Sequence, residues 1–276
     1  MTIEELIIYG KGKIHSDYAK MLLADLIGVN PLELLTMLDR KVDEDIIATY
    51  KEKVSQVEEK KPVQYVIGNV NFYGNIFNVN KNVLIPRFET EELVDNTINY
   101  INSFFDVEDL DIIDLGTGSG CIGLTLKKNI PTSSVILVDI SKSALEVAES
   151  NSKKLELDVE LLNNDMLEGI DKKFNIIISN PPYIKIDEEI EDIVKENEPH
   201  LALYGGVDGL EYYKKILSHA KNNVKDKYLI AFEIGDTLRN DVIDIAKEYF
   251  PNANIVAKKD IYNRDRMIFI SNLNID

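Results

Sequence analysis

Residues 111–120 read Asp-Ile-Ile-Asp-Leu-Gly-Thr-Gly-Ser-Gly. A short apolar run that ends at turn-forming residues predicts a buried β-strand over Asp111–Leu115. The glycines that follow predict a tight turn into a helix, because glycine takes positive φ and lets a backbone approach a ligand closely. Ligands of open α/β sheets bind at the carboxyl ends of the strands. This stretch therefore predicts both a fold class and the position of a ligand site.

Apolar runs of the same kind recur after this loop, and helical segments fall between most of them. Such alternation predicts an α/β fold with a mainly parallel sheet. The last two runs are separated by too few residues for a helical crossover, so we expect them to pair antiparallel. The seven predicted strands are Asp111–Leu115, Val135–Asp139, Val159–Leu162, Phe174–Ser179, Tyr228–Ile234, Ile255–Lys259 and Met267–Ile270.

The region before the sheet has a different pattern. Thr2 and Glu5 match a helix capping box, and Ser16 is a second candidate cap. Helical periodicity continues to about Lys60, which predicts a small all-α domain over residues 1–61. Pro62 then interrupts the pattern, and Gly74-Asn75 predicts the turn of a β-hairpin linker over residues 62–83. Thr90 is a candidate cap for the first helix of the third part, residues 84–276.

The composition excludes several classes of protein. The chain has 276 residues, of which 45% are hydrophobic and 29% charged, as in ordinary globular proteins. No apolar stretch is long enough to span a membrane, and the acidic N-terminus is not that of a signal peptide. Cys121 is the single cysteine, which fits a cytoplasmic protein, and we expect it to be packed rather than nucleophilic. Three scattered histidines predict no metal site. They are His15, His200 and His219.

The glycine loop has two possible cofactors. Gly118, Gly120 and Gly123 satisfy the G-x-G-x-x-G pattern of NAD enzymes, and Asp139 lies near the position expected of the acid that binds the ribose. Asp114, however, comes before the glycines, where an acid suits a sulfonium or ammonium group better than a pyrophosphate. The loop Gly116-Thr117-Gly118-Ser119-Gly120 also has the spacing of S-adenosylmethionine (SAM) enzymes. We therefore favour SAM over NAD, with Asp139 accepting the ribose hydroxyls.

The tetrapeptide Asn180-Pro181-Pro182-Tyr183 follows the fourth predicted strand. The two prolines fix φ and carry no N–H, so the turn holds its carbonyls rigidly. Asn180 adds a side-chain carbonyl, and Tyr183 adds a flat face. Two fixed acceptors suit a planar NH₂ group on a conjugated carbon, whose nitrogen they can orient for in-line attack on a methyl sulfonium.

Two substrates carry such a group, namely a glutamine amide and the exocyclic amine of adenine. The tetrapeptide alone does not distinguish them. The formal net charge is −17, which disfavours binding to free nucleic acid. Between Asp187 and Glu198, shortly after Tyr183, seven acids accompany the single base Lys195 and form a poor surface for a phosphate backbone. They are Asp187, Glu188, Glu189, Glu191, Asp192, Glu196 and Glu198.

The chain resembles the bacterial peptide chain release factor glutamine N5-methyltransferases over nearly its whole length. Asn180–Tyr183 is shared with other methyltransferases, whereas Ile85-Pro86-Arg87-x-Glu89-Thr90-Glu91 joined to Pro62-Val63-Gln64-Tyr65 is far more specific. The other matching pieces are the Asp114–Gly120 loop, Asp139, Glu198-Pro199, Gly206-x-Asp208-Gly209-Leu210, Glu233-Ile234-Gly235 and Asp265-Arg266.

The resemblance implies a class I SAM methyltransferase (Rossmann-like) fold with a helical N-terminal domain and a hairpin linker. It implies SAM in the Gly116–Gly120 loop, the ribose on Asp139 and the adenine beside Asp165 and Met166. It further implies that Asn180, which also borders the cofactor, acts with Pro181, Pro182 and Tyr183 on the glutamine of the Gly-Gly-Gln motif of class 1 release factors. Methylation of that glutamine assists translation termination.

The sequence departs from this family in three places and leaves several questions open. Phe88 replaces a usual proline, Met166 replaces an aromatic residue of some members, and Asn263 replaces a common glycine. Arg87 and Glu89 fit either a cofactor entrance or a structural salt bridge. Ribosomal protein glutamine N5-methylation and adenine-N6 methylation remain alternative functions, with an NAD-dependent oxidoreductase as a more distant one. We expect no stable nucleic-acid or membrane partner.

Overall fold

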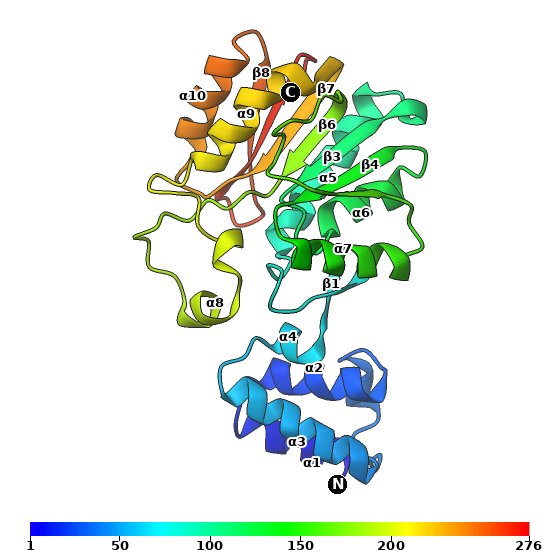
Figure 1. Ribbon diagram of the computed structural model, residues 1–276. Helices are drawn as coiled ribbons and strands as arrows, with labels where there is room; N and C mark the ends of the chain where they lie inside the picture. Colours follow the sequence, from blue (N-terminus) through cyan, green and yellow to red (C-terminus); the bar gives the residue numbers. More distant parts are fainter. Residues whose placement is uncertain (276) are drawn as a thin grey trace. The chain divides into compact units, whose positions relative to one another are not determined.

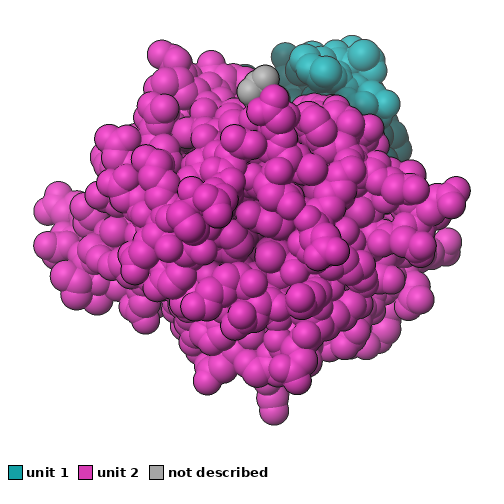
Figure 2. Space-filling model, turned by 90° about the horizontal axis from the view of Figure 1, so that it is seen from above, with its two compact units in different colours: residues 1–70, 191–197 teal, residues 71–190, 198–276 magenta. Residues whose placement is uncertain are grey.

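The computed structural model describes residues 1–275 and divides into two compact units. The first unit contains residues 1–70 and 191–197, and the second contains residues 71–190 and 198–276, of which residue 276 is not described. Figure 2 colours the two units separately. Residues 191–197 join the first unit although they lie far from it in the sequence. Within that unit, Asn197 Nδ2 donates to the Lys60 carbonyl over 3.2 Å.

The first unit is helical (Figure 1). Its helices are α1 (Ile3–Lys11), α2 (Ser16–Ile27), α3 (Glu44–Glu58), α4 (Val63–Ile67) and α8 (Asp192–Asn197), with a 3₁₀ turn η1 (Glu33–Thr36). The capping box of Thr2 and Glu5 is present as predicted. The second predicted cap is wrong, because Ser16 is the first helical residue and the His15 ring accepts from the Asp17 N–H instead. Apolar side chains of α1, α2 and α3 form one buried core around Tyr50.

The hairpin is shorter than the predicted linker. Helix α4 fills Val63–Ile67 and packs against α2 and α3, and the hairpin strands are β1 (Asn69–Phe72) and β2 (Asn75–Asn78). The turn lies at Tyr73-Gly74, one residue before the predicted Gly74-Asn75, and both turn residues have positive φ. Tyr73 tolerates this conformation because its N–H donates to Glu91 and its hydroxyl donates to Asp95.

The second unit contains the predicted seven-stranded sheet, in the order β5-β4-β3-β6-β7-β9-β8. Five strands are parallel, and β9 pairs antiparallel with both β7 and β8, which confirms the expectation for the last two runs. The strands are β3 (Asp111–Leu115), β4 (Ser134–Asp139), β5 (Glu160–Asn163), β6 (Phe174–Ser179), β7 (Val224–Glu233), β8 (Asn254–Lys259) and β9 (Asp265–Ser271).

Helices cover both faces of this sheet. They are α5 (Phe88–Phe104), α6 (Cys121–Asn129), α7 (Lys142–Lys154), α9 (Glu211–Asn223) and α10 (Arg239–Tyr249), with 3₁₀ turns η2 (Val107–Asp109) and η3 (His200–Ala202). Alternation along β9 separates the faces, because successive strand residues point to opposite sides. Ile268 and Ile270 belong to the core beneath α9 and α10, whereas Phe269 contacts Tyr100 of α5 with ring centroids 4.9 Å apart.

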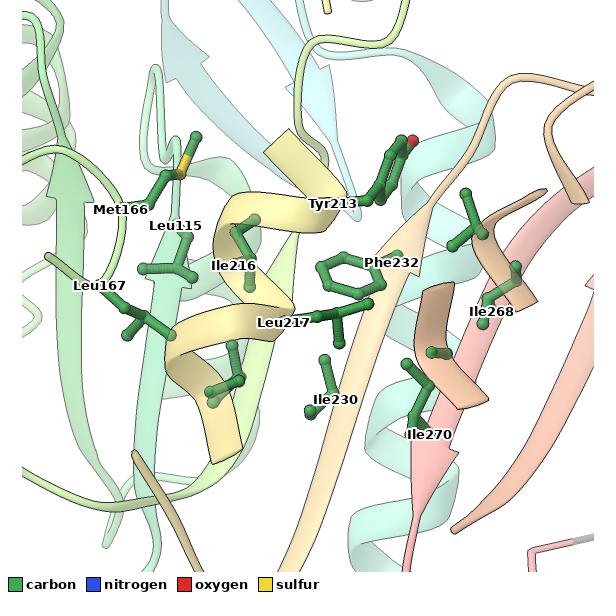
Figure 3. Packing of buried hydrophobic residues seen from close by; sticks show 14 of the residues in the cluster. Leu115, Met166, Leu167, Tyr213, Ile216, Leu217, Ile230, Phe232, Ile268 and Ile270 are labelled. Atoms are coloured by element: carbon green, nitrogen blue, oxygen red, sulfur yellow. The ribbon is translucent and has the colours of Figure 1, made fainter. Parts of the chain in front are cut away.

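The core beneath α9 and α10 fixes the position of the strands (Figure 3). Tyr213 of α9 packs edge-to-face on Phe232 of β7, with ring centroids 5.4 Å apart. Leu217 lies beside Phe232 and Ile230, whereas Ile216 lies on the side of Leu115 of β3, which belongs to the same cluster as Met166. The core therefore extends from the last strands to the beginning of the glycine loop.

The strand order places a switch point between β3 and β6. From β3 the chain moves outward to β4 and β5, and it then returns to β6 on the other side of β3. Ligand sites of open α/β sheets form at such a point, at the carboxyl ends of the strands. The carboxyl ends of β3, β4 and β6 lead into the glycine loop, Asp139 and Asn180, respectively. The topology thus gathers the main residues that the sequence singles out.

Gly123 of α6 permits close packing of this helix on the sheet. A Cβ at this position would lie 2.2 Å from Leu137 Cδ2 and 3.1 Å from the Asp114 carboxylate. Both neighbours are buried, so neither can move away freely. The third glycine of the apparent G-x-G-x-x-G pattern therefore has a packing role.

We expect Gly123→Ala to lower the free energy of unfolding by about 1–3 kcal/mol, the range typical of overpacked cores. Urea unfolding of the purified protein measures the change. Gly12→Ala is the matched control, since a Cβ there would approach its nearest neighbouring atom no more closely than 3.4 Å. That control should stay within about 0.5 kcal/mol of wild type. Equal effects of the two substitutions would contradict the tight contact.

Candidate functional site

A cavity of about 170 Å³ opens at the carboxyl edge of the sheet, within the second unit. Its lining includes seven residues that the sequence or the family resemblance predicted for the site: Gly116, Gly118, Asp139, Asp165, Met166, Asn180 and Pro182. The remaining lining residues are Asn82, Val83, Leu84, Ile140, Ser141, Ala144, Asn164, Pro199, Leu201, Ala202, Glu211, Tyr212 and Lys215. The cavity thus brings predicted cofactor and substrate residues to one place.

The glycine loop borders the cavity with its backbone. Gly116, Gly118 and Gly120 have φ of 68°, 55° and 81°, a conformation that residues with a Cβ rarely adopt. The Gly118 N–H donates to Asp139 Oδ2 over 2.9 Å, which joins the loop to the end of β4. The predicted loop residues Thr117 and Ser119 are buried and do not line the cavity, nor does Gly120.

Asp114 has a different position from the one that the sequence suggested. Its carboxylate is fully buried beneath the loop, where Oδ2 accepts from the Thr117 hydroxyl over 2.5 Å and from the Gly123 N–H over 3.0 Å. It does not line the cavity, so the expected contact with a sulfonium or ammonium group is not supported. Burial raises the pKa of Asp114 to about 7. Asp114 therefore holds the shape of the loop.

Asp139 is the carboxylate that does face the cavity. Oδ1 accepts from the Ser141 N–H over 2.8 Å, and Oδ2 accepts from Gly118. Each carboxylate oxygen has a second lone pair, so both can still accept from a ligand hydroxyl. Burial raises the pKa of Asp139, and the two backbone hydrogen bonds oppose that effect.

Asp165 and Met166 form the next part of the lining. Asp165 pairs with Lys215 of α9 over 2.5 Å. Met166 has a φ of 52°, which is unusual for a residue with a side chain. Its methyl group lies 3.7 Å from the position that a Cβ on Gly116 would occupy. The thioether consequently presents an apolar surface beside the glycine loop.

The Asn180-Pro181-Pro182-Tyr183 turn borders the cavity on the β6 side. Asn180 and Pro182 line it, whereas Pro181 and Tyr183 are outside the lining. The Tyr183 ring lies 3.3 Å from where a Cβ on Gly235 would be, so this glycine leaves room for it. Burial raises the pKa of the Tyr183 phenol. Tyr183 therefore supports the turn as a neutral side chain.

Two residues behind Asn180 had no predicted role at the site. Asn180 Nδ2 donates to Thr90 Oγ1 over 3.2 Å, and Thr90 Oγ1 donates to Glu233 Oε2 over 2.6 Å. Thr90 is the third residue of α5, so the prediction that it caps this helix is wrong. Thr90 and Glu233 belong to two segments that resemble the family, Glu89-Thr90-Glu91 and Glu233-Ile234-Gly235. The sequence could therefore draw attention to them, but only the tertiary structure shows that they are in contact.

Arg87 and Glu89 are both in salt bridges. Arg87 Nη2 pairs with Glu198 over 2.5 Å, and Glu89 pairs with Arg264 over 2.9 Å. Glu198 is 5% exposed and also accepts from the Ile85 N–H, so it does not belong to the acidic surface that the sequence suggested. The other six acids of that segment are exposed.

Four further features of residues 1–275 bear on the predictions made from the sequence. Burial raises the pKa of the Cys121 thiol to about 12, which agrees with a packed rather than a nucleophilic cysteine. In this part of the chain, no group of three or more metal-ligating side chains is found. Nor does any helix there have the length and apolarity needed to cross a membrane. Asn263 has a φ of 63°, as its replacement of a glycine predicts.

The raised pKa of Asp114 predicts a measurable effect of pH. Between its ordinary pKa of 3.8 and about 7, the folded state holds a proton that the unfolded state has lost. This carboxyl therefore lowers the free energy of unfolding as pH rises, by up to about 1.4 kcal/mol per pH unit, and the decline ends above pH 7. We expect Asp114→Asn to lose less stability than wild type between pH 5 and pH 8, measured by urea unfolding.

Asp111→Asn, on the same strand, is the matched control. Burial opposes ionisation of Asp111, but ion pairs with Lys172 and Lys225 prevail and lower its pKa. Its contribution is therefore lost only at more acidic pH, and this variant should keep the wild-type slope between pH 5 and pH 8. A wild-type slope in Asp114→Asn as well would show that Asp114 is ionised in the folded protein.

Two methyltransferases are among the solved structures with a similar fold. The 16S rRNA N2 G1207 methyltransferase of Thermus thermophilus, solved with AdoMet and guanosine, matches with a TM-score of 0.55 and 15% identity, over 74% of this chain and 49% of that one. A methyltransferase of Pyrococcus furiosus matches with a TM-score of 0.54 and 15% identity, over 83% and 99%. At these identities the likeness shows the fold alone.

Sequence comparisons are more specific. Residues 90–206 match the family model described as Methyltransferase small domain, and residues 15–68 match the PrmC N-terminal domain. The release factor glutamine methyltransferase of Bacillus subtilis is 41% identical, over 91% of this chain and 89% of that protein. The enzymes of the same name from Flavobacterium psychrophilum and Streptococcus pneumoniae are 39% and 36% identical, over 86% and 94% of their lengths. This chain therefore belongs to the release factor glutamine methyltransferase family.

Proposed function

We propose that this protein transfers a methyl group from SAM to the side-chain amide nitrogen, N5, of the glutamine in the Gly-Gly-Gln motif of class 1 peptide chain release factors. The observation that carries this proposal is that Asn180 and the glycine loop border one cavity. The activity named for the relatives supports the identity of the substrate. Such a reaction would assist translation termination in the cytoplasm, where release factors act.

The residues of the cavity fit SAM by their chemistry. Gly116 and Gly118 expose backbone without side chains, so a ligand can approach closely. Asp139 retains acceptor capacity for the ribose hydroxyls, and Asp165 and Met166 offer a polar and an apolar contact for the adenine. SAM supplies an electrophilic methyl group when bound. The protein would contribute position and electrostatic environment.

The turn at Asn180 fits a primary amide. The amide nitrogen is a poor nucleophile because its lone pair is delocalised into the carbonyl. The Asn180 side-chain oxygen can accept one of its N–H groups, and the rigid Pro181-Pro182 backbone offers further carbonyl acceptors. Together they would orient the nitrogen and favour its pyramidal form in the transition state. The methylated nitrogen then loses its proton readily, so no strong base is required.

The alternatives receive less support. Adenine-N6 methylation requires contact with a phosphate backbone, whereas the segment after the turn carries six exposed acids and the chain has a net charge of −17. Ribosomal protein glutamine methylation shares the amide chemistry, but the curated relatives reported above are named for release factors. An NAD-dependent oxidoreductase would not explain membership of this family.

Labelled methyl transfer tests the proposal directly. Purified protein with radiolabelled SAM is offered class 1 release factor, ribosomal protein and DNA in parallel reactions. We expect label only in the release factor, at the glutamine of its Gly-Gly-Gln motif, and none after replacement of that glutamine. Label in ribosomal protein or DNA with none in release factor would replace this proposal by the corresponding alternative.

A substitution at Asn180 separates its proposed role from cofactor binding. We expect Asn180→Ala to lower kcat by about 10²–10³-fold, the scale for removing one group that stabilises a transition state. SAM affinity, measured by calorimetry, should change little because Asp139 and the glycine loop make the main contacts. Unchanged methyl transfer by this variant would show that the tetrapeptide is only a turn.

Asp139→Ala should have the opposite profile. Loss of a charged acceptor for the ribose hydroxyls costs about 1.5–3 kcal/mol per hydrogen bond, so SAM affinity should fall at least tenfold. The KM for SAM should rise with it, whereas the KM for the release factor should not. If calorimetry gave this variant the same SAM affinity as wild type, Asp139 would not belong to the proposed cofactor site.

A further inference from the structure

We propose that Thr90 and Glu233 are positioning residues that fix which end of the Asn180 side-chain amide faces the substrate. This inference rests on the proposed function, because the orientation matters for a substrate that offers N–H groups. Neither residue lines the cavity, so both would act through Asn180.

The three residues come together from three separate elements. Asn180 directly follows β6, Glu233 is the last residue of β7, and Thr90 lies in the first turn of α5. The parallel pairing of Ser179 with Phe232 places Asn180 and Glu233 at neighbouring positions of the sheet edge. Thr90 and Glu233 are each 2% exposed, so water does not replace their hydrogen bonds.

The hydrogen bonds of these residues have one consistent direction. When Glu233 is ionised, its carboxylate can only accept, so the Thr90 hydroxyl donates its single proton to Glu233. The Thr90 oxygen is then an acceptor, which selects the NH₂ end of the Asn180 amide. The carbonyl end of Asn180 is left for the cavity. A rotated amide would present N–H groups to the N–H groups of the substrate.

Several charged and titratable groups act on Glu233. Burial raises the pKa of Glu233 to about 7, hydrogen bonds from Thr90 and Asn180 and the charge of Arg266 lower it, and the charge of Glu89 raises it. Tyr183 and Tyr213 are also close enough to interact electrostatically, and the Tyr213 hydroxyl donates to the Glu233 main-chain oxygen. The charge of Glu233 also contributes to the raised pKa of the Cys121 thiol. Protonated Glu233 can donate a hydrogen bond to Thr90. The Thr90 hydroxyl could then donate to Asn180, which would reverse the direction of both hydrogen bonds.

A pair of threonine substitutions on α5 tests the role of the hydroxyl. Thr90→Val removes it with little change of shape. Thr97→Val is the matched control, because Thr97 is equally buried on the same helix but donates only to the Leu93 carbonyl. We expect Thr90→Val to lower kcat roughly 10–100-fold, the scale known for hydrogen-bond partners that orient metal ligands, with unchanged SAM affinity. Thr90→Ser, which keeps the hydroxyl, should restore most of this loss.

The orientation of Asn180 can also be measured without any reaction. The side-chain NH₂ signals of Asn180 in ¹⁵N-labelled protein, assigned by their loss in Asn180→Asp, report its hydrogen bonds. In wild type we expect the Asn180 NH₂ protons to exchange slowly with solvent. We also expect their chemical shifts to change with pH, with a midpoint near pH 7, the pKa of Glu233. Glu233→Gln should abolish that midpoint, which separates Glu233 from the carboxyls of Asp114 and Asp139. Thr90→Val should speed the exchange, whereas Thr97→Val should not.

The outcomes distinguish this inference from the proposed function. Equal kcat for Thr90→Val and Thr97→Val, or Asn180 signals unchanged by Thr90→Val, would overturn the positioning role even if wild type methylates release factor. Absence of methyl transfer by wild type would overturn the proposed function, and the Asn180 signals would still decide whether Thr90 and Glu233 fix the amide. A fall in kcat that Thr90→Ser does not restore would indicate loss of packing and contradict the inference.

Discussion

The pairing of β3 with β6 is the contact on which the site depends. Leu115 and Ser179, the last residues of these strands, are register partners, and the Ser179 hydroxyl donates to the Leu115 carbonyl over 2.7 Å. The glycine loop begins one residue after Leu115, and the Asn180 turn begins one residue after Ser179. This single pairing therefore places the proposed cofactor and substrate residues side by side. A shift of one residue in its register would reverse the faces of one strand and separate them.

Two buried carboxylates support the two halves of the site from behind. Asp114 holds the glycine loop through Thr117 and Gly123, and Glu233 holds the Asn180 turn through Thr90. Burial of a carboxylate is unfavourable unless hydrogen bonds compensate it, and in both cases burial raises the pKa to about 7. The protein thus accepts an energetic cost at two places that fix the shape of neighbouring polar groups. Such costs are commonly found at functional sites.

The proposed chemistry depends on position rather than on a strong acid or base. The cavity combines exposed backbone, an acceptor carboxylate and a rigid turn, which together would hold an electrophilic methyl group and a weak nucleophile in line. Because the Asn180 carbonyl would act by accepting a hydrogen bond, its orientation is as important as its presence. This requirement gives a physical reason for a buried polar network behind a residue at the edge of a cavity.

The sequence by itself determined the fold class, the approximate positions of the strands, the antiparallel last pair and seven of the residues that border the cavity. It could do so because apolar periodicity, glycines with positive φ and prolines act locally, and because the carboxyl ends of parallel strands must meet at one edge. Only the tertiary structure decided where Asp114 points, that Glu198 is buried, that the hairpin turn lies at Tyr73-Gly74, and that Thr90 contacts Glu233. Those features join residues up to 143 positions apart, and no local pattern specifies which buried polar group will find which partner.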